Sequence, residues 1–224
     1  MPESDILRAN PWFASLPEAL ADAVLAAGRV QKLAAGEVLF RQGDAPGDWH
    51  AVCRGAIKAS STSADGTESI LAVLEPGNWF GEISLLDAGP RVHDATAMGA
   101  TAVFAVPADA FARFMQDATF ATALARLMAG RLRTLFGIVE DATLRPTRAR
   151  LARRLALLAR GDATQSPAPR RQLPVSQEAL AMMLGLTRQT LSKELGELAK
   201  AGALKLGYRT IEIVDAALLD QLGS

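Results

Sequence analysis

The chain has 224 residues, which is long for one domain and sufficient for two, and half of its residues are hydrophobic, which excludes wholesale disorder. The formal net charge is zero, but the charges are unevenly distributed. From Arg145 onward there are 13 Lys and Arg and 7 Asp and Glu, so this part has a net charge of +6 and the rest of the chain −6. A single cysteine, Cys53, excludes an intrachain disulfide, a four-cysteine zinc site and an iron–sulfur cluster held by several cysteines. No apolar run resembles a signal peptide or a membrane span, so the sequence predicts a soluble cytoplasmic protein with no membrane partner.

Apolar residues interrupted by two prolines predict short helices over the first 25 residues. From about Val30 to Val106 the pattern changes to short runs rich in Val, Ile and aromatic residues, separated by glycines, which is typical of β-strands. Asp65-Gly66, between two such runs, predicts a hairpin turn. Strands at this close, regular spacing indicate a sandwich, a barrel or a jelly roll. The runs are Glu37–Phe40, Trp49–Cys53, Ala56–Ser60, Ser69–Leu74, Ala95–Met98 and Ala102–Val106.

After Pro107 the helical period returns, first in a short helix around Phe111 and Phe114 and then in a long helix from Phe120 to about Thr143. Apolar residues recur in the long helix at alternating spacings of four and three, the heptad pattern of a helix that packs against a partner helix. A second row, Leu124, Leu127 and Ile138, would face the β domain. We expect a homodimer, the alternative being that both rows pack within one chain. The heptad positions are Ala121, Ala125, Met128, Leu132, Leu135, Val139 and Ala142, of which Met128, Leu132, Leu135 and Val139 are the predicted dimer contacts.

Arg145-Pro146 ends the long helix, because proline cannot continue a helix and restricts the residue before it, and this break predicts a hinge. Leu151, Leu155 and Leu158 mark a further amphipathic helix. Gly161–Pro174 is polar and contains three prolines, which predicts an exposed loop.

The segment from Ser176 to Leu198 predicts two helices joined by a tight turn. Ser176 and Thr187 are suited to cap the two helices, and Gly185 to end the first. The second helix would bury one apolar face and expose a polar one, a pattern typical of a DNA-binding helix-turn-helix. The alternative is an ordinary helical hairpin with a solvated polar face. The apolar face consists of Leu191, Leu195 and Leu198, and the polar face of Arg188, Gln189, Ser192 and Lys193.

Two short strands, Ala203–Leu206 and Thr210–Val214, follow on either side of a turn at Gly207-Tyr208-Arg209. They predict a β-wing, so the C-terminal part is a winged helix. A helical turn over Ala216–Leu222 would complete it.

In this order of elements the chain resembles the CRP/FNR superfamily of bacterial transcription regulators. The segments that carry the resemblance are Gly36–Asp44, Gly77–Leu86, Pro90-Arg91 and Gly185–Lys193. The resemblance implies an α+β fold with a cyclic-nucleotide-binding-type β-roll (jelly roll) over residues 1–117, a dimerisation helix and hinge over 118–145, and a winged helix-turn-helix over 146–224. It also implies a homodimeric regulator without enzymatic activity that binds palindromic double-stranded DNA, interacts with RNA polymerase and responds to a small effector in the β-roll.

The resemblance further implies which residues hold the effector. In cyclic-nucleotide-binding members the residues matching Gly81, Glu82, Ile83, Ser84 and Arg91 hold the sugar and the phosphate, as suits a carboxylate facing ribose hydroxyls and an arginine fork facing a phosphate. This chain departs from the pattern at Val92, where a hydroxyl residue is usual, and at Leu135 and Phe136, where hydroxyl residues contact adenine in cyclic-AMP-binding members. Three alternatives remain open: cyclic AMP, another cyclic nucleotide or dinucleotide, or no effector. Glu82 and Arg91 could also form a structural ion pair in an empty or apolar pocket.

On the DNA side, Arg188, Gln189, Ser192 and Lys193 match the base-reading positions of the family, and Ser176, Gln177 and Thr187 are candidate phosphate contacts at helix N-termini. Gln189 and Lys193 replace a common Glu and Arg, which predicts a half-site shifted from the usual one. Glu194 stands where an apolar residue is common, which predicts unusual packing of the second helix.

Two other classes of function fit the residues less well. A metal-dependent enzyme of the cupin type needs several histidine and carboxylate ligands, and the chain has only His50 and His93. The same two histidines are more typical of structural or surface positions than of haem ligands, although His93 with Asp94 could line the effector pocket. A nucleotide-binding module that does not bind DNA would leave the winged helix and its positive charge without a role.

Overall fold

The computed structural model describes residues 3–161, 170–173, 175–207 and 210–224. By its internal contacts the chain divides into two compact units, Met1–Gly66 with Leu71–Arg131, and Thr67–Ile70 with Leu132–Ser224. This division falls inside the long helix, whereas the predicted domain limits at residues 117 and 145 follow the ends of that helix. The predicted limits at residues 117 and 145 therefore remain a proposal about which segment performs each function.

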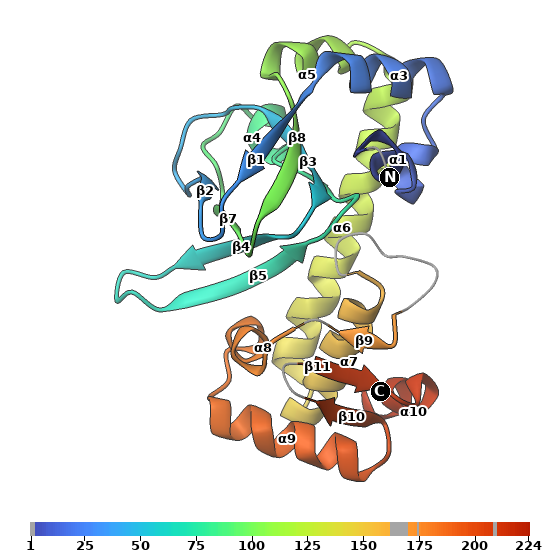
Figure 1. The fold of residues 1–224 in the computed structure, drawn as a ribbon. Coiled ribbons are helices and arrows are strands. Elements are labelled where there is room, and N and C mark those ends of the chain that lie inside the picture. The colour runs from blue at the N-terminus through green and yellow to red at the C-terminus, as the bar shows by residue number, and fades with distance from the viewer. Residues whose placement is uncertain (1–2, 162–169, 174, 208–209) are drawn as a thin grey trace. The chain divides into compact units, whose positions relative to one another are not determined.

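The β-roll of the first unit consists of two four-stranded sheets with strand orders β1-β8-β3-β6 and β2-β7-β4-β5 (Figure 1). The pairings β1–β8, β3–β8, β3–β6, β2–β7 and β4–β7 are antiparallel. The sequence predicted six of these strands but not β1, which is rich in polar residues, nor β6, which is only two residues long. The strands are β1 (Arg29–Leu33), β2 (Val38–Phe40), β3 (Trp49–Arg54), β4 (Ile57–Thr62), β5 (Glu68–Leu74), β6 (Trp79–Phe80), β7 (Asp94–Ala97) and β8 (Thr101–Val106).

The predicted turn between β4 and β5 is confirmed. Gly66 has φ +85°, in the left-handed region that glycine adopts without strain, and its N–H donates to the Ser63 carbonyl oxygen at 2.9 Å.

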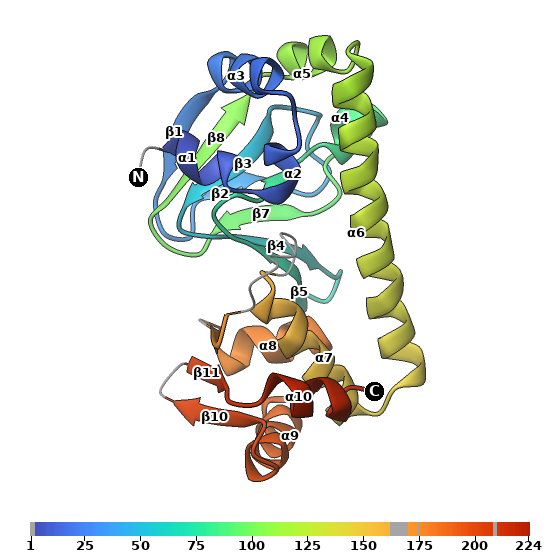
Figure 2. The same ribbon diagram turned by 90° about the vertical axis from the view of Figure 1, so that its right-hand side faces the viewer.

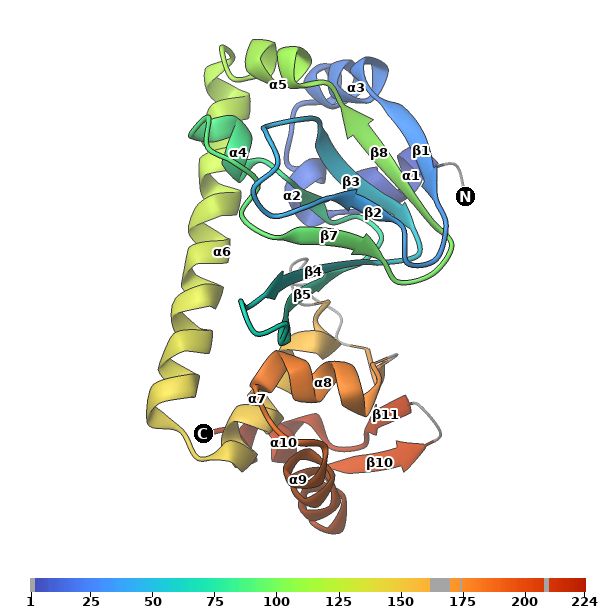
Figure 3. The same cartoon turned by 90° about the vertical axis from the view of Figure 1, so that its left-hand side faces the viewer.

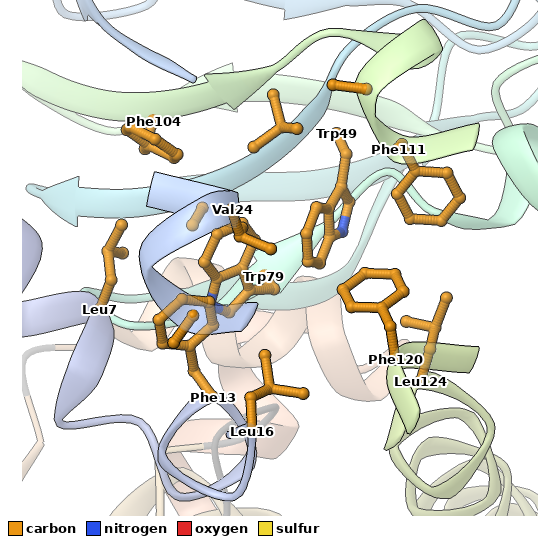
Figure 4. Close-up of a cluster of buried hydrophobic side chains, with 14 of the residues drawn as sticks. Leu7, Phe13, Leu16, Val24, Trp49, Trp79, Phe104, Phe111, Phe120 and Leu124 are labelled. Carbon is orange, nitrogen blue, oxygen red and sulfur yellow. The ribbon is translucent and has the colours of Figure 1, made fainter. Parts of the chain in front are cut away.

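Aromatic side chains form the core between the sheet β1-β8-β3-β6 and the helices packed on it (Figure 4). Trp49 stacks on Trp79 with ring centroids 4.1 Å apart, and Phe13 stacks on the other side of Trp79 at 5.0 Å. The indole N–H of Trp12 donates to the Ala123 carbonyl oxygen at 2.7 Å, which ties the N-terminal helices to the long helix. The helices of this unit are α1 (Glu3–Arg8), α2 (Pro11–Ala14), α3 (Glu18–Ala27), α4 (Ile83–Leu86), α5 (Ala108–Phe114) and the first half of α6 (Ala118–Leu144).

The long helix α6 is continuous over 27 residues, as predicted (Figure 2). In the second apolar row, Leu124 is fully buried and Leu127 packs against the aromatic core, whereas Ile138 is exposed. In the heptad row, Met128 contacts the core, but Leu132, Leu135 and Val139 are 50%, 54% and 53% exposed. The second half of the helix therefore leaves its heptad row exposed.

The second unit contains the winged helix (Figure 3). Its three-stranded sheet has the order β10-β11-β9. Leu151 and Leu155 of α7 are fully buried and Leu158 nearly so, as predicted. The short strand β9 was not predicted, because it lies in the polar segment read as a loop. Residues 162–169 and 174 of that loop, and the wing turn at Tyr208 and Arg209, lie outside the described residues. The elements are α7 (Thr147–Ala159), β9 (Gln172–Leu173), α8 (Gln177–Leu184), α9 (Arg188–Lys200), β10 (Leu204–Gly207), β11 (Thr210–Ile213) and α10 (Ala216–Leu222).

Candidate functional site

The helix pair α8–α9 has the predicted caps and turn. The Ser176 hydroxyl accepts a hydrogen bond from the Ala179 N–H at 3.1 Å, and the Thr187 hydroxyl accepts one from the Thr190 N–H at 3.2 Å. Gly185 takes the left-handed conformation with φ +62°, and the Leu186 N–H then donates back to the Ala181 carbonyl oxygen at 3.0 Å. The sequence therefore sets the start of both helices and the end of α8 locally.

The two faces of α9 differ as expected of a helix that lies on a core and meets a ligand on its other side. Leu191, Leu195 and Leu198 are completely buried. The predicted base-reading residues are all exposed, and so is Thr187 at the helix N-terminus; these are Arg188, Gln189, Ser192 and Lys193. At the start of α8, Gln177 is exposed and Ser176 half-buried.

Glu194 is explained by an ion pair that the sequence did not predict. Its side chain is only 13% exposed, and its Oε2 lies 2.8 Å from Nε of Arg148 on α7. Arg148 also approaches Glu197 at 3.9 Å, so one arginine links α7 to two carboxylates of α9. The charge that replaces an apolar side chain here is thus neutralised within the unit.

A second group of polar residues lies buried in the β-roll around Arg91, which is 4% exposed. Arg91 Nη1 donates to the Gly81 carbonyl oxygen at 2.7 Å and to the Ser84 hydroxyl at 3.1 Å, and Nη2 donates to the Asp48 carbonyl oxygen at 2.7 Å. Its guanidinium lies over the Phe40 ring, 4.3 Å from the centroid, a cation–π contact. These hydrogen-bond acceptors are all uncharged.

The alternative in which Glu82 pairs with Arg91 is wrong. Glu82 Oε1 lies 2.6 Å from Nη1 of Arg131 on α6, and Arg131 also donates to the Trp79 carbonyl oxygen. Arg131 was missed because nothing in its spacing separates it from the solvated arginines of the same helix. The one signal in the sequence was that Arg131 lies four residues before Leu135, a predicted effector residue, and so on the same face of that helix.

Gly81 is required by its conformation and by its neighbour. Its φ is +89°, and a Cβ at this position would lie 2.8 Å from Nη1 of Arg91. A side chain would therefore strain the backbone and displace the guanidinium.

Two histidines lie beside the Arg91 group. Burial, followed by the positive charges of Arg91 and Arg29, lowers the pKa of His50 to about 3, and its ring stacks on Phe80 at 5.4 Å. The pKa of His93 is also lowered, mainly by burial. Both imidazoles are therefore neutral near pH 7. Asp94 Oδ1 accepts from the Gln42 N–H at 2.7 Å.

The remaining predicted effector residues are not buried in this group. Ile83 and Val92 are exposed beside it, and Leu135 and Phe136 are exposed residues of the other unit. Across the described ranges no cluster of three or more His, Cys, Asp or Glu side chains could hold a metal ion, and no helix has the length and apolarity needed to cross a membrane.

Comparison with known proteins assigns each region to a known type of domain. The family model "Cyclic nucleotide-binding domain" matches residues 30–118, and the model "Crp-like helix-turn-helix domain" matches residues 149–222. The chain is 32% identical to the cyclic AMP receptor protein of Thermus thermophilus over 96% of its own length and 98% of that protein. The chain belongs to the CRP/FNR family of transcription regulators.

Other relatives agree with this membership. The CRP-like cAMP-activated global transcriptional regulator of Mycobacterium tuberculosis is 29% identical to this CRP/FNR chain, over 82% of the chain and 83% of that protein. The structure of FixK2 from Bradyrhizobium japonicum superposes with a TM-score of 0.76 at 24% identity, covering 88% and 98% of the two chains, and supports the fold. The CRP/FNR protein is thus a transcription regulator with a cyclic-nucleotide-binding-type β-roll and a DNA-binding helix-turn-helix.

Proposed function

We propose that this regulator is a homodimer that reads a palindromic DNA site with α9 and changes its DNA affinity when a small anionic effector binds in the β-roll. The observation that carries the DNA-binding role is the division of α9 into a completely buried leucine face and an exposed polar face. A recognition helix needs both, because the first fixes it on the domain and the second meets the major groove.

The exposed residues divide into two roles by their chemistry. Arg188, Gln189, Ser192 and Lys193 would contact base edges, since arginine and lysine donate to guanine and glutamine pairs with adenine. Ser176, Gln177 and Thr187 stand at helix N-termini, whose backbone N–H groups attract phosphate. With Gln189 and Lys193 in place, we expect a half-site shifted from the usual one of the family.

The dimer would form through the exposed heptad row of α6. Leu132, Leu135 and Val139 leave a stripe of apolar surface on one side of a helix that extends beyond the first unit, and a second copy of the same helix would cover it. A two-fold dimer presents two α9 helices, which matches a palindromic site.

The effector site would be the Arg91 group, with backbone from Gly81 and Ile83 and the side chains of Glu82, Ser84 and Arg91. A buried guanidinium whose hydrogen-bond acceptors are all uncharged favours an anion. The names of the Thermus and Mycobacterium relatives make cyclic AMP a first candidate, followed by other cyclic nucleotides and dinucleotides. Binding would shift the population of α6 orientations about the hinge at Arg145-Pro146. The two α9 helices would then bind the promoter in a different orientation, and the contact with RNA polymerase would change with them.

An effector-independent regulator is the second candidate. It is favoured by the hydrogen bonds of Arg91 to Gly81, Ser84 and Asp48, which supply the guanidinium with partners from the protein itself. Mass spectrometry of small molecules that co-purify with the native protein separates the two candidates, because only a controlled regulator retains a stoichiometric anion.

The DNA proposal is tested by selecting bound duplexes from a random pool and measuring their mobility shift with wild-type protein and Lys193→Ala. We expect the variant to lose about 1–3 kcal/mol of specific affinity, roughly 5- to 150-fold. Lys32→Ala, an exposed lysine of β1, is the matched control and should bind as wild type. Equal binding by both variants would contradict the assignment of α9 as the reading helix.

The dimer is tested by sedimentation of Leu135→Glu. A carboxylate buried against an apolar partner helix is strongly unfavourable, so we expect monomers at concentrations where the wild type is dimeric. Leu144→Glu changes an exposed leucine outside the heptad row and should leave the dimer intact. A wild-type protein that sediments as a monomer at high concentration would refute the proposal.

A further inference from the structure

The Arg91 group contains several buried polar atoms that have no hydrogen-bond partner among the described residues. Besides Nδ1 of His50, they are Oε2 of Glu82, Nε of Arg131 and Nε2 of His93. The three residues come from separate parts of the chain: the start of α4, the long helix α6 and the loop before β7. Buried polar atoms are usually paired, so their convergence on one place marks a site that is completed by something else.

His93 lies beside the Arg91 group. Burial lowers the pKa of its imidazole, and the charges of Glu82, Arg91, Asp94 and Arg131 also act on that pKa. Its ring centroid lies 6.1 Å from that of Phe40, the ring over which the Arg91 guanidinium lies. His93 and Arg91 therefore share one aromatic neighbour and one local environment.

Val92 stands between these two residues and gives the site no hydrogen-bond donor. Its side chain is apolar and exposed, so the polar side chains of this short segment are those of Arg91, which is buried, and His93, whose Nε2 is a buried atom. Because the imidazole is neutral, its Nε2 can donate to an oxygen or, once protonated, strengthen that contact with its charge.

We propose that His93 is a specificity-determining residue of the effector site, whose Nε2 hydrogen-bonds an anionic oxygen of the ligand that Arg91 neutralises. The ligand class is a small phosphate-bearing anion with a hydroxyl group for Glu82. This inference rests on the proposed effector site in the β-roll, and it adds a contact that the resemblance to cyclic-nucleotide-binding members does not supply.

The contact has a consequence for pH. An anionic oxygen beside His93 raises the pKa of the imidazole relative to the free protein, so binding takes up a proton and affinity rises as the pH falls toward 6. The other charged groups that act on His93 are Glu82, Arg91, Asp94 and Arg131. His50, whose ring centroid lies 5.9 Å from that of Phe40, has a pKa of about 3 and stays neutral.

The test is calorimetric titration of the full-length protein with cyclic AMP and with cyclic GMP, at roughly pH 7.5 and pH 6. His93→Phe keeps a ring against Phe40 but removes the nitrogen, and we expect it to weaken binding about tenfold and to abolish the pH dependence. His93→Gln keeps a donor that does not titrate, so it should recover part of the affinity but none of the pH dependence. Thermal unfolding of each variant shows that the protein is folded.

Arg91→Gln separates failure of this inference from failure of the proposed function. Binding that is lost in Arg91→Gln but unchanged, with the same pH dependence, in His93→Phe would overturn the role of His93 and leave the effector site in place. Wild-type protein that binds neither nucleotide would overturn both.

Discussion

The two polar sites of this regulator differ in where their side chains find their partners. The guanidinium of Arg91 and the carboxylate of Glu82 are buried, the first bonded to groups of the β-roll and the second to Arg131 of α6, whereas the proposed reading residues of α9 are exposed. A buried polar side chain is held in the folded state by its neighbours, so removing one leaves another unpaired. An exposed side chain is free for a ligand, so its removal costs binding rather than folding.

The largest effect expected from this comparison is that of Glu82→Ala. It leaves Arg131, which is about three-quarters buried, without its carboxylate, and we expect the free energy of unfolding to fall by about 3 kcal/mol. Urea denaturation measures it. A loss below about 1 kcal/mol would show that the Glu82–Arg131 pair is no stronger than a surface ion pair.

His50 predicts a stability that declines in mild acid. The unfolded chain has the ordinary histidine pKa of 6.5 and the folded chain about 3, so the stability is complete above pH 6.5 and declines as the pH falls toward 3. Between pH 7.5 and 5 the loss should be about 2 kcal/mol. His50→Phe keeps a ring against Phe80. Over the same pH interval its free energy of unfolding should fall by about 2 kcal/mol less than that of the wild type. An identical pH dependence in both proteins would contradict the buried neutral imidazole.

Arg148→Ala tests the link between α7 and α9. The carboxylate of Glu194 is left nearly buried without its close partner, and we expect a loss of about 1 kcal/mol in stability together with weaker specific DNA binding, since α9 is less firmly held. The double variant Arg148→Ala/Glu194→Leu places an apolar side chain there and should restore both. If Arg148→Ala lowers stability but leaves selected-site affinity unchanged, the ion pair does not position the reading helix.

The smallest effect is expected for Glu178→Ala. Glu178 forms an exposed ion pair with Arg188, and exposed pairs contribute little, so the stability should stay within about 0.5 kcal/mol of wild type. DNA affinity should rise slightly, because Arg188 no longer has a carboxylate competing with the DNA and one negative charge is gone. A mobility shift on the selected duplex detects the change, and weaker binding would assign Glu178 a contact of its own.

The same division explains what was predictable from the sequence. The caps at Ser176 and Thr187, the stop at Gly185 and the leucine face of α9 depend on residues a few positions apart, so periodicity and local hydrogen bonding identify them. The hairpin at Asp65-Gly66 and the long helix α6 are local in the same sense. The strand β9 was missed because it depends on pairing with β11, about 40 residues away, and its own two residues carry no strand pattern.

The partners within the β-roll were beyond sequence reasoning for a related reason. Glu82 and Arg91 are nine positions apart and of opposite charge, yet each finds another partner: Glu82 pairs with Arg131, and Arg91 is bonded to backbone carbonyls. Backbone carbonyls have no signature in a sequence, and Arg131 is one of several arginines on its helix. Glu194 was recognised as unusual, but Arg148 could be named as its partner only from the structure.

The chain's three tryptophans, Trp12, Trp49 and Trp79, all lie in one aromatic cluster of the β-roll, and Trp12 is bonded to the backbone of α6. Tryptophan fluorescence therefore arises entirely from this unit and from the point where the long helix is attached to it. A shift of α6 would change the emission and the near-ultraviolet dichroism of the stacked Trp49–Trp79 pair, while events confined to the winged helix would leave both spectra unaltered. The protein therefore carries its own optical reporter of the proposed shift of α6, without any added label.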